Sequence, residues 1–240
     1  MVASHGYELE THEVITKDGY ILGMHRIPRG RQSNSSHSES RPVVYIQHGL
    51  TSSSADWLVS GPDKALSTRD IFKLHPTHLF IDKPIPGYVL AENGYDVWLG
   101  NYRGNLYSRK HRILNPDSLW NNDYWQFSWV PRLGMIFYDK FDISNHFRWD
   151  QCGEYDIPAM IDYIRNVTGQ GTIQYIGFSM GTTGFMVAMN EHPDIVNKVK
   201  AAHLLAPVAY LEHFEGPQNL LRPFTDVIEV GLSLEWVHTT

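Results

Sequence analysis

Short apolar runs recur along the chain and are separated by polar or glycine-rich stretches. Runs of this length, rich in β-branched and aromatic residues, are typical of strands that are buried on both faces. We predict strands over 42–47, 95–100, 172–177 and 200–206.

Between the second and third runs, the apolar positions follow the period of a helix. Within 157–164 they fall at i, i+3, i+4 and i+7, which places them on one face, and Pro158 lies in the first turn. Gly169 and Gly171 then end the pattern. The sequence therefore predicts an amphipathic helix that begins near Ile157.

A second helix is expected over 182–190, which has helical length and apolar content and ends before His192 and Pro193. Strand, helix, strand, helix, strand is the pattern of a parallel sheet covered on both faces. The predicted fold class is therefore α/β.

The first segment reads as a β-hairpin. Extended runs over 13–16 and 20–26 flank Asp18-Gly19, a pair typical of type I′ turns, which need positive φ. The stretch 28–42 that follows is dense in serine and cannot bury a core, so we expect a solvated connector.

Composition excludes some classes of protein. The 240 residues are 42% hydrophobic and 19% charged with a net charge of −6, which is ordinary for a globular domain and gives no attraction to nucleic acid. No apolar run approaches the roughly 20 residues of a membrane span.

The N-terminus does not resemble a signal peptide, because it has neither a basic head nor an apolar stretch. Cys152 is the single cysteine, so an internal disulfide is excluded. Sequons at Asn34 and Asn166 matter only if the chain enters the secretory pathway, where it would become a glycoprotein.

The sequence Gly177-Phe178-Ser179-Met180-Gly181 matches the pattern G-x-S-x-G, between a predicted strand and a predicted helix. Side chains at the two glycine positions would clash with a sharp strand-to-helix turn, and the strained turn would lift the Ser179 hydroxyl clear of the sheet at a helix N-terminus. We predict that Ser179 is a nucleophile. The alternative is a glycine-rich turn without catalysis.

His48-Gly49-Leu50 follows the strand predicted over 42–47. In hydrolases of this architecture, one N–H from this loop and the N–H after the nucleophile form an oxyanion hole. Those donors would be the backbone N–H groups of Leu50 and Met180. The alternative is a strand that simply ends in a glycine turn.

These motifs resemble those of the acid lipases, the family of gastric, lysosomal and many insect lipases. The resemblance covers most of the chain. The matching stretches are 6–28, 48–57, 60–62, 94–98, 101–105, 107–109, 125–128, 155–159, 177–183 and 205–209.

The resemblance implies an α/β-hydrolase fold with a helical cap and hydrolysis of carboxylic esters such as triacylglycerols or cholesteryl esters. Ser179 would form an acyl-enzyme that water then cleaves. The resemblance implies no metal and no organic cofactor. It implies a lipid ester substrate, transient contact with a lipid surface and a secreted or lysosomal location.

The chain departs from the family at several points. Phe178 and Met180 stand where the family usually has His and Gln. Family members are longer, and their Asp and His of the triad follow the serine in motifs that this chain lacks. The acidic and histidine residues after Ser179 are Asp194, Asp226, His192, His203, His213 and His238, and none lies in a matching motif.

The resemblance divides the chain into 1–212, the N-terminal part of the hydrolase domain, and 213–240, the beginning of a cap. Segments 67–86 and 129–148 interrupt the family pattern as insertions. We hypothesise that each is an intron read through as coding sequence, which sequencing of the spliced transcript tests. The alternative is a pair of genuine surface loops, which are thermodynamically cheap to lengthen.

Two functions of different class follow. The first is a serine ester hydrolase. The second is a truncated, catalytically inactive lipase-like protein that at most binds lipid, because removing part of a triad costs several powers of ten in rate.

Overall fold

A computed structural model describes residues 2–31, 41–59, 61–62, 86–118, 123–125, 127 and 150–209. The proposed cap at 213–240 and the insertion at 129–148 lie outside these residues, as does the insertion at 67–86 apart from Pro86. Asp226, His213 and His238 also lie outside them.

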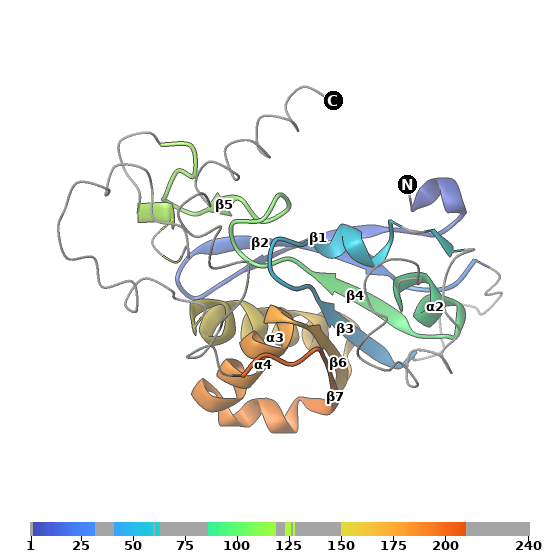
Figure 1. Cartoon of the computed structure of the whole chain (residues 1–240). Helices are drawn as coiled ribbons and strands as arrows, with labels where there is room; N and C mark the ends of the chain where they lie inside the picture. Colours follow the sequence, from blue (N-terminus) through green and yellow to red (C-terminus); the bar gives the residue numbers. More distant parts are fainter. Residues whose placement is uncertain are drawn as a thin grey trace, which may run out of the picture.

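One mixed sheet forms the centre of the described structure (Figure 1). Its strands run in the spatial order β1-β2-β4-β3-β6-β7, with β5 paired to β2. Strands β4, β3, β6 and β7 are mutually parallel, whereas β1, β2 and β5 are antiparallel to their neighbours. The bounds are β1 Glu10–Ile15, β2 Tyr20–Ile27, β3 Val43–Gln47, β4 Asp96–Gly100, β5 Lys110–His111, β6 Ile173–Phe178 and β7 Val199–Leu205.

The predicted parallel strands are all present, each within a residue of its predicted ends. Strand β3 is buried at every position, as expected for a central strand covered on both faces. The parallel strands of the predicted α/β sheet are therefore confirmed.

The hairpin of β1 and β2 is also present, but its turn is not the predicted type I′. Type I′ requires positive φ at both central residues, and only Gly19, at φ 99°, has it. The Thr16 N–H donates to the Tyr20 carbonyl and the Gly19 N–H donates to the Thr16 carbonyl, so the loop spans three residues. A three-residue loop needs a single left-handed residue at its end, and Gly19 supplies it.

Helices begin and end where local sequence signals favour it. Helix α3 begins at Ile157, as predicted, and ends before Gly169, whose φ of 69° and N–H bond to the Arg165 carbonyl close the last turn. A π-helical turn over Cys152–Asp156 precedes it. The bounds of the longer helices are α2 Pro86–Glu92, α3 Ile157–Thr168 and α4 Met180–Glu191, and those of the 3-10 turns are Ala3–His5, Ser54–Trp57, Asp123–Trp125 and Pro193–Asn197.

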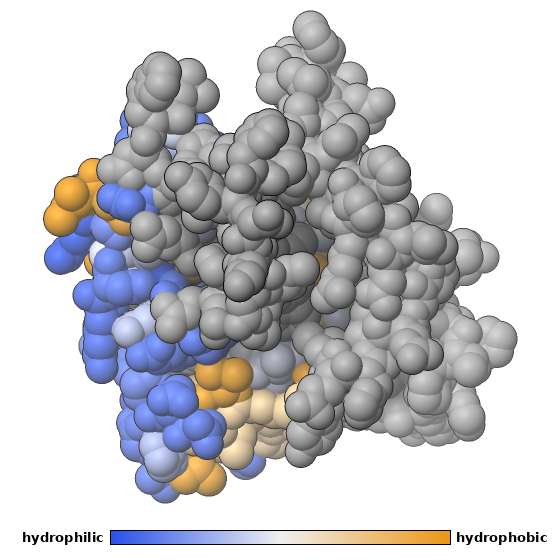
Figure 2. Space-filling view, turned by 60° about the vertical axis from the view of Figure 1, so that its left-hand side comes forward, coloured by the Kyte–Doolittle hydropathy of each residue, from blue (hydrophilic) through white to orange (hydrophobic). Residues whose placement is uncertain are grey.

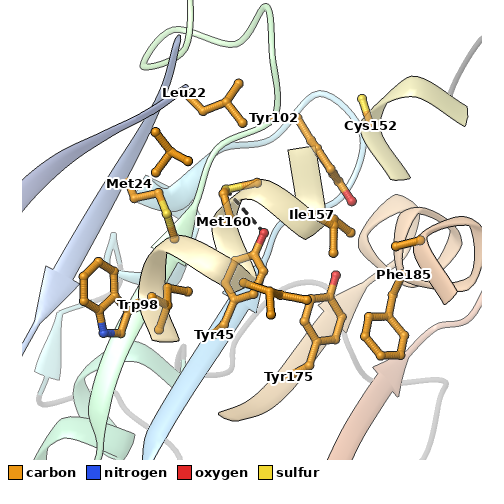
Figure 3. Packing of buried hydrophobic residues seen from close by; sticks show 14 of the residues in the cluster. Leu22, Met24, Tyr45, Trp98, Tyr102, Cys152, Ile157, Met160, Tyr175 and Phe185 are labelled. Atoms are coloured by element: carbon orange, nitrogen blue, oxygen red, sulfur yellow. Dashed lines mark hydrogen bonds between the residues drawn. The ribbon is translucent and has the colours of Figure 1, made fainter. Parts of the chain in front are cut away.

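Alternate side chains of the strands pack into two apolar cores on opposite faces of the sheet. Tyr45 and Tyr175 belong to the core that α3 and α4 cover, and their rings lie side by side beneath α3 (Figure 3). The Tyr175 ring stacks on Phe185 of α4 at 4.3 Å between centroids. Val44 and Leu99 point to the other face, which α2 covers. Helices therefore fix the sheet from both sides.

Helix α4 approaches the end of β3 so closely that no side chain fits between them. An ideal Cβ on Gly181 would lie 2.7 Å from the Gln47 carbonyl oxygen and 3.1 Å from that of His48. A Cβ on Gly177 would lie 2.9 Å from the Gly181 carbonyl oxygen. Both glycines therefore allow α4 to start directly above the ends of β3 and β6.

A buried ion network ties distant parts of the chain together. Arg103, just beyond β4, has a fully buried side chain. Its Nε lies 2.8 Å from the Asp156 carboxylate, and its backbone N–H donates to the same group at 3.0 Å. Its guanidinium also binds Asp18 at the hairpin tip and lies 4.1 Å from the Tyr20 ring. The hairpin, the loop after β4 and the π-helical turn are thus joined at one cation.

In the space-filling view, the described part of the visible face is largely hydrophilic, with small separate hydrophobic patches (Figure 2). Within the described ranges, no helix is both long enough and apolar enough to cross a bilayer.

Replacing Arg103 by alanine should strongly destabilise the fold, because it leaves the Asp156 carboxylate buried without its counter-ion. We expect Arg103→Ala to lower the free energy of unfolding by about 3–5 kcal/mol. Urea denaturation measures this change. Arg29→Ala is the matched control, because Arg29 pairs with Glu8 near the surface, with both side chains at least a third exposed, and such pairs contribute about 1 kcal/mol or less. Equal losses for the two variants would contradict the role given to the buried network.

Adding a single methyl group at Gly181 should also destabilise the fold, since the Gln47 carbonyl that it would meet belongs to the backbone of a central strand. We expect Gly181→Ala to lower the free energy of unfolding by about 2 kcal/mol, the usual scale of overpacking. The control is Gly171→Ala, because nothing lies within 4 Å of a Cβ at that position. Thermal or urea unfolding compares the two, and unchanged stability of Gly181→Ala would show that α4 can move away from β3.

Candidate active site

The ends of β3 and β6 lie at the same level because the two strands are paired in register. Gln47 is the partner of Gly177. Loops that leave the carboxyl ends of adjacent parallel strands meet at one edge of the sheet, where α/β proteins place their sites. The approach is close here, because a Cβ on Gly49 would lie 3.2 Å from the Cβ of Ser179. The structure therefore brings the two predicted motifs together.

Ser179 forms the sharp bend between β6 and α4. Its φ of 51° and ψ of −115° lie in a region that non-glycine residues rarely adopt, at a cost of roughly 1–3 kcal/mol. Its N–H donates to the Leu205 carbonyl at 2.9 Å. Its carbonyl accepts from the Thr182 N–H at 2.8 Å and from the Thr182 hydroxyl at 2.6 Å. These bonds hold the strained turn that the sequence predicts.

The side chain of Ser179 makes no capping bond, although the residue is the N-cap of α4. Serine at this position ordinarily accepts a hydrogen bond from a backbone N–H in the first helical turn. Ser179 is only half-buried, and within the described part of the chain no group bonds to its hydroxyl. The hydroxyl therefore lies at the positive end of the helix dipole without a hydrogen-bond partner among the described residues.

Backbone strain is concentrated around this bend. Thr51, Ser179 and Ala206 have φ of 54°, 51° and 48°, and they are the non-glycine residues with positive φ in the described structure. They lie in the loops after β3, β6 and β7, which are adjacent strands. Strained backbone conformations cluster at functional sites, where the surrounding structure holds them.

Two threonines of α4 hold the loop after β7 against the bend. The Thr182 hydroxyl accepts a bond from the Val208 N–H at 3.1 Å, and the Thr183 hydroxyl donates to the Val208 carbonyl at 2.6 Å. The loop that contains Ala206 is therefore fixed beside Ser179.

One predicted oxyanion donor follows Ser179 in the chain, and the other belongs to the loop after β3. Met180 follows Ser179 directly, and Leu50 lies in the loop that contacts it through Gly49. No described residue accepts a hydrogen bond from the N–H of Leu50 or of Met180.

Phe178, which replaces the usual histidine of the family, packs into the apolar core that α2 covers. Its ring meets Trp57 edge-on at 6.4 Å. A Cβ on Gly49 would lie 3.1 Å from the Phe178 ring, so a larger residue at position 49 would require that ring to shift.

His48 is fully enclosed behind the loop. Its Nδ1 lies 2.7 Å from the Gly49 carbonyl oxygen, and its Nε2 accepts from the Tyr102 N–H at 3.2 Å and from Asn105 Nδ2 at 3.1 Å. Burial lowers the pKa of the His48 imidazole to about 4, so the ring is neutral at neutral pH. Because both ring nitrogens are engaged, His48 is not positioned to take a proton from Ser179.

The described histidines and aspartates after Ser179 do not form a triad with it. His192 ends α4, at the far end of the helix from Ser179, and bonds to the Glu154 carbonyl. Asp194 pairs with Lys198. His203 lies on β7 opposite Ile176, within the sheet.

A hollow of about 510 Å³ lies elsewhere, between the end of β1 and the start of α3. Its lining includes Lys198 and Asp162, which form an ion pair with each other. It lacks Ser179, so it is not the candidate site. The described residues contain no group of three or more His, Cys, Asp or Glu side chains placed to hold a metal ion.

His48, Asn101 and Asn105 lie within the motifs identified from the sequence, but the sequence patterns assign no supporting role to their side chains. The sequence feature that could have indicated this role is the pair Asn101 and Asn105, four residues apart and directly after the buried strand that ends at Gly100. Asn101 Oδ1 accepts from the Ser54 N–H and from Asn105 Nδ2, each at 2.9 Å.

Comparison with known proteins agrees with this architecture. Residues 42–227 match the family described as alpha/beta hydrolase fold, and residues 1–61 match the partial alpha/beta-hydrolase lipase region. Among solved structures, an esterase of Pyrococcus furiosus aligns with a TM-score of 0.50 at 17% identity, over 94% of this chain and 67% of that one.

Curated relatives are lipases. Lipase 3 of Drosophila melanogaster is 39% identical over 93% of this chain, and gastric triacylglycerol lipase is 38% identical in Mus musculus over 90% and 35% identical in Homo sapiens over 92%. The alignments cover 44–45% of these relatives, so the chain spans slightly less than half of their length.

The matched family, the sheet order and the strand-to-helix bend agree, and the chain belongs to the α/β-hydrolase family, with lipases of the gastric type among its relatives.

Proposed function

We propose that the protein is a serine ester hydrolase that acts on lipid esters, either acylglycerols or sterol esters, through Ser179. One observation carries the proposal. Ser179 is held in a costly backbone conformation, at a helix N-cap, and its hydroxyl does not cap the helix. A strained residue whose side chain makes no hydrogen bond to stabilise the helix is typical of a functional site.

The chemistry follows from the groups around the bend. The Ser179 oxygen attacks the acyl carbon and loses its proton to a base, and the ester carbonyl oxygen becomes an oxyanion. The N–H groups of Leu50 and Met180 bind that oxyanion, a contribution of about 3–4 kcal/mol from each donor. The alcohol leaves with a proton, and water then cleaves the acyl-enzyme to return Ser179 and release the carboxylic acid.

The base lies outside the described residues in this proposal. His48 is engaged at both ring nitrogens, and His192 lies at the opposite end of α4. In the family, the acidic residue and the histidine follow the serine in the chain.

The substrate class rests on the relatives, whose names include gastric triacylglycerol lipase. On the same basis we propose transient contact with a lipid surface and a secreted or lysosomal location. Nothing in the net charge of −6 favours nucleic acid as a partner.

Replacing Ser179 by alanine should abolish turnover, because the acyl-enzyme cannot form. We expect Ser179→Ala to lower the rate of hydrolysis of a short-chain nitrophenyl ester by about 10⁴-fold or more. Labelling by a serine-directed fluorophosphonate, read by mass spectrometry of the peptide that contains residue 179, should also disappear. Ser4→Ala is the control, because Ser4 is exposed and lies in the 3-10 turn at Ala3–His5, away from the bend.

The same experiment also tests the alternative, a truncated and catalytically inactive lipase-like protein. If the folded, unmutated chain neither hydrolyses the ester nor reacts with the fluorophosphonate, the catalytic proposal fails. The protein would then be a lipase-like protein that at most binds lipid.

A further inference from the structure

The protonation of His48 is determined by its neighbours. The group facing Nδ1 is a carbonyl, that of Gly49, which can only accept. The groups facing Nε2 are the Tyr102 N–H and the Asn105 amide, which donate. The ring is therefore neutral, with its proton on Nδ1 and a bare Nε2.

The orientation of the Asn105 amide is fixed independently. Its Oδ1 accepts from the Tyr107 N–H at 2.9 Å, and its Nδ2 donates to Asn101 Oδ1 at 2.9 Å. Asn101 Nδ2 in turn donates to the Gly23 carbonyl on β2 at 3.0 Å. A chain of hydrogen bonds thus runs from a neighbouring strand to Nε2 of His48 and sets its tautomer.

The bond from His48 Nδ1 also sets the direction of the next amide. The described peptide bonds are all trans, and in a trans peptide the C=O and the following N–H point in opposite directions. Because the Gly49 oxygen is drawn toward the buried ring, the Leu50 N–H points away from it. Without that bond the peptide could rotate easily, since residue 49 is a glycine.

We infer that His48 is a positioning residue that locks the peptide between Gly49 and Leu50, so that the Leu50 N–H faces the acyl group bound at Ser179. Asn105 supports it by holding the required tautomer. The inference rests on the proposed function, because it assigns His48 a role in that reaction. His48 does not touch the reacting atoms and acts only through the loop.

Two substitutions separate this role from a general contribution to packing. In His48→Asn, the side-chain amide can occupy the position of Nδ1 and donate to Gly49, but it has no group at the position of Nε2. In His48→Gln, the longer side chain can present an oxygen to Tyr102 and Asn105, but it lacks the donor to Gly49. Each variant keeps one of the two bonds of the ring.

If the bond from His48 Nδ1 to the Gly49 carbonyl positions the Leu50 N–H, His48→Asn should keep kcat within about tenfold of the unmutated protein. His48→Gln should lower kcat by about 100-fold, the effect of losing one oxyanion donor. KM should change little in both, because the donor acts on the transition state. His12→Gln is the matched control, since the His12 ring is also bonded at both nitrogens but lies on β1. Its kcat should stay within about twofold.

The tautomer is measured separately, without any substrate. Long-range proton–nitrogen correlation on the unmutated protein at neutral pH should show the proton of His48 on Nδ1. A proton on Nε2, or a charged ring, would overturn the inference.

The kinetic outcomes are equally decisive. An active protein in which His48→Gln equals or exceeds His48→Asn would show that His48 serves packing only, and it would leave the role of Ser179 intact. If instead the unmutated protein neither hydrolyses the ester nor labels at Ser179, the proposed function fails, and the inference fails with it.

Discussion

The pairing of Gln47 with Gly177 in adjacent parallel strands is the constraint on which the candidate site depends. It ends β3 and β6 at the same level, so that the loop 48–50 and the bend at Ser179 leave the sheet side by side. It also places the first turn of α4 over the Gln47 carbonyl, which is why residue 181 has no room for a side chain. A slip of one residue would reverse the side chains of β6 relative to both cores.

Two buried polar groups, Arg103 and His48, organise the loops around this pair of strands in different ways. Arg103 keeps its charge, since the carboxylates of Asp156 and Asp18 surround it. His48 is kept neutral, because its described hydrogen-bond partners include no carboxylate and those that face its Nε2 are donors. In both cases hydrogen bonds offset the cost of burying a polar group and also fix its geometry.

Sequence patterns predicted the strands, the helix at Ile157 and the strained bend, because each depends on neighbouring residues. They predicted a turn at Asp18-Gly19 but not its three-residue form, in which the aspartate is bound by Arg103 far along the chain. They included His48 in a motif without giving its side chain a role, since its tautomer depends on Tyr102 and Asn105 after a different strand. The local sequence therefore indicates where the strained bend at Ser179 lies, whereas the geometry of its surroundings comes from contacts that no short motif contains.

The Arg103 network has a consequence for the order of folding. Arg103 lies 85 positions after Asp18 and 53 positions before Asp156 in the chain, and the network joins all three residues. Closing such long loops costs entropy before any bond is gained, so contacts of this kind form late and slow the search for the native topology. The hairpin of β1 and β2 can pair locally at an early stage, but its tip stays without its partner until β4 and the π-helical turn have docked. A chain in which Asp18 and Asp156 are still exposed has therefore not finished folding. Binding of both carboxylates by Arg103 is the step that joins the hairpin, the loop after β4 and the π-helical turn.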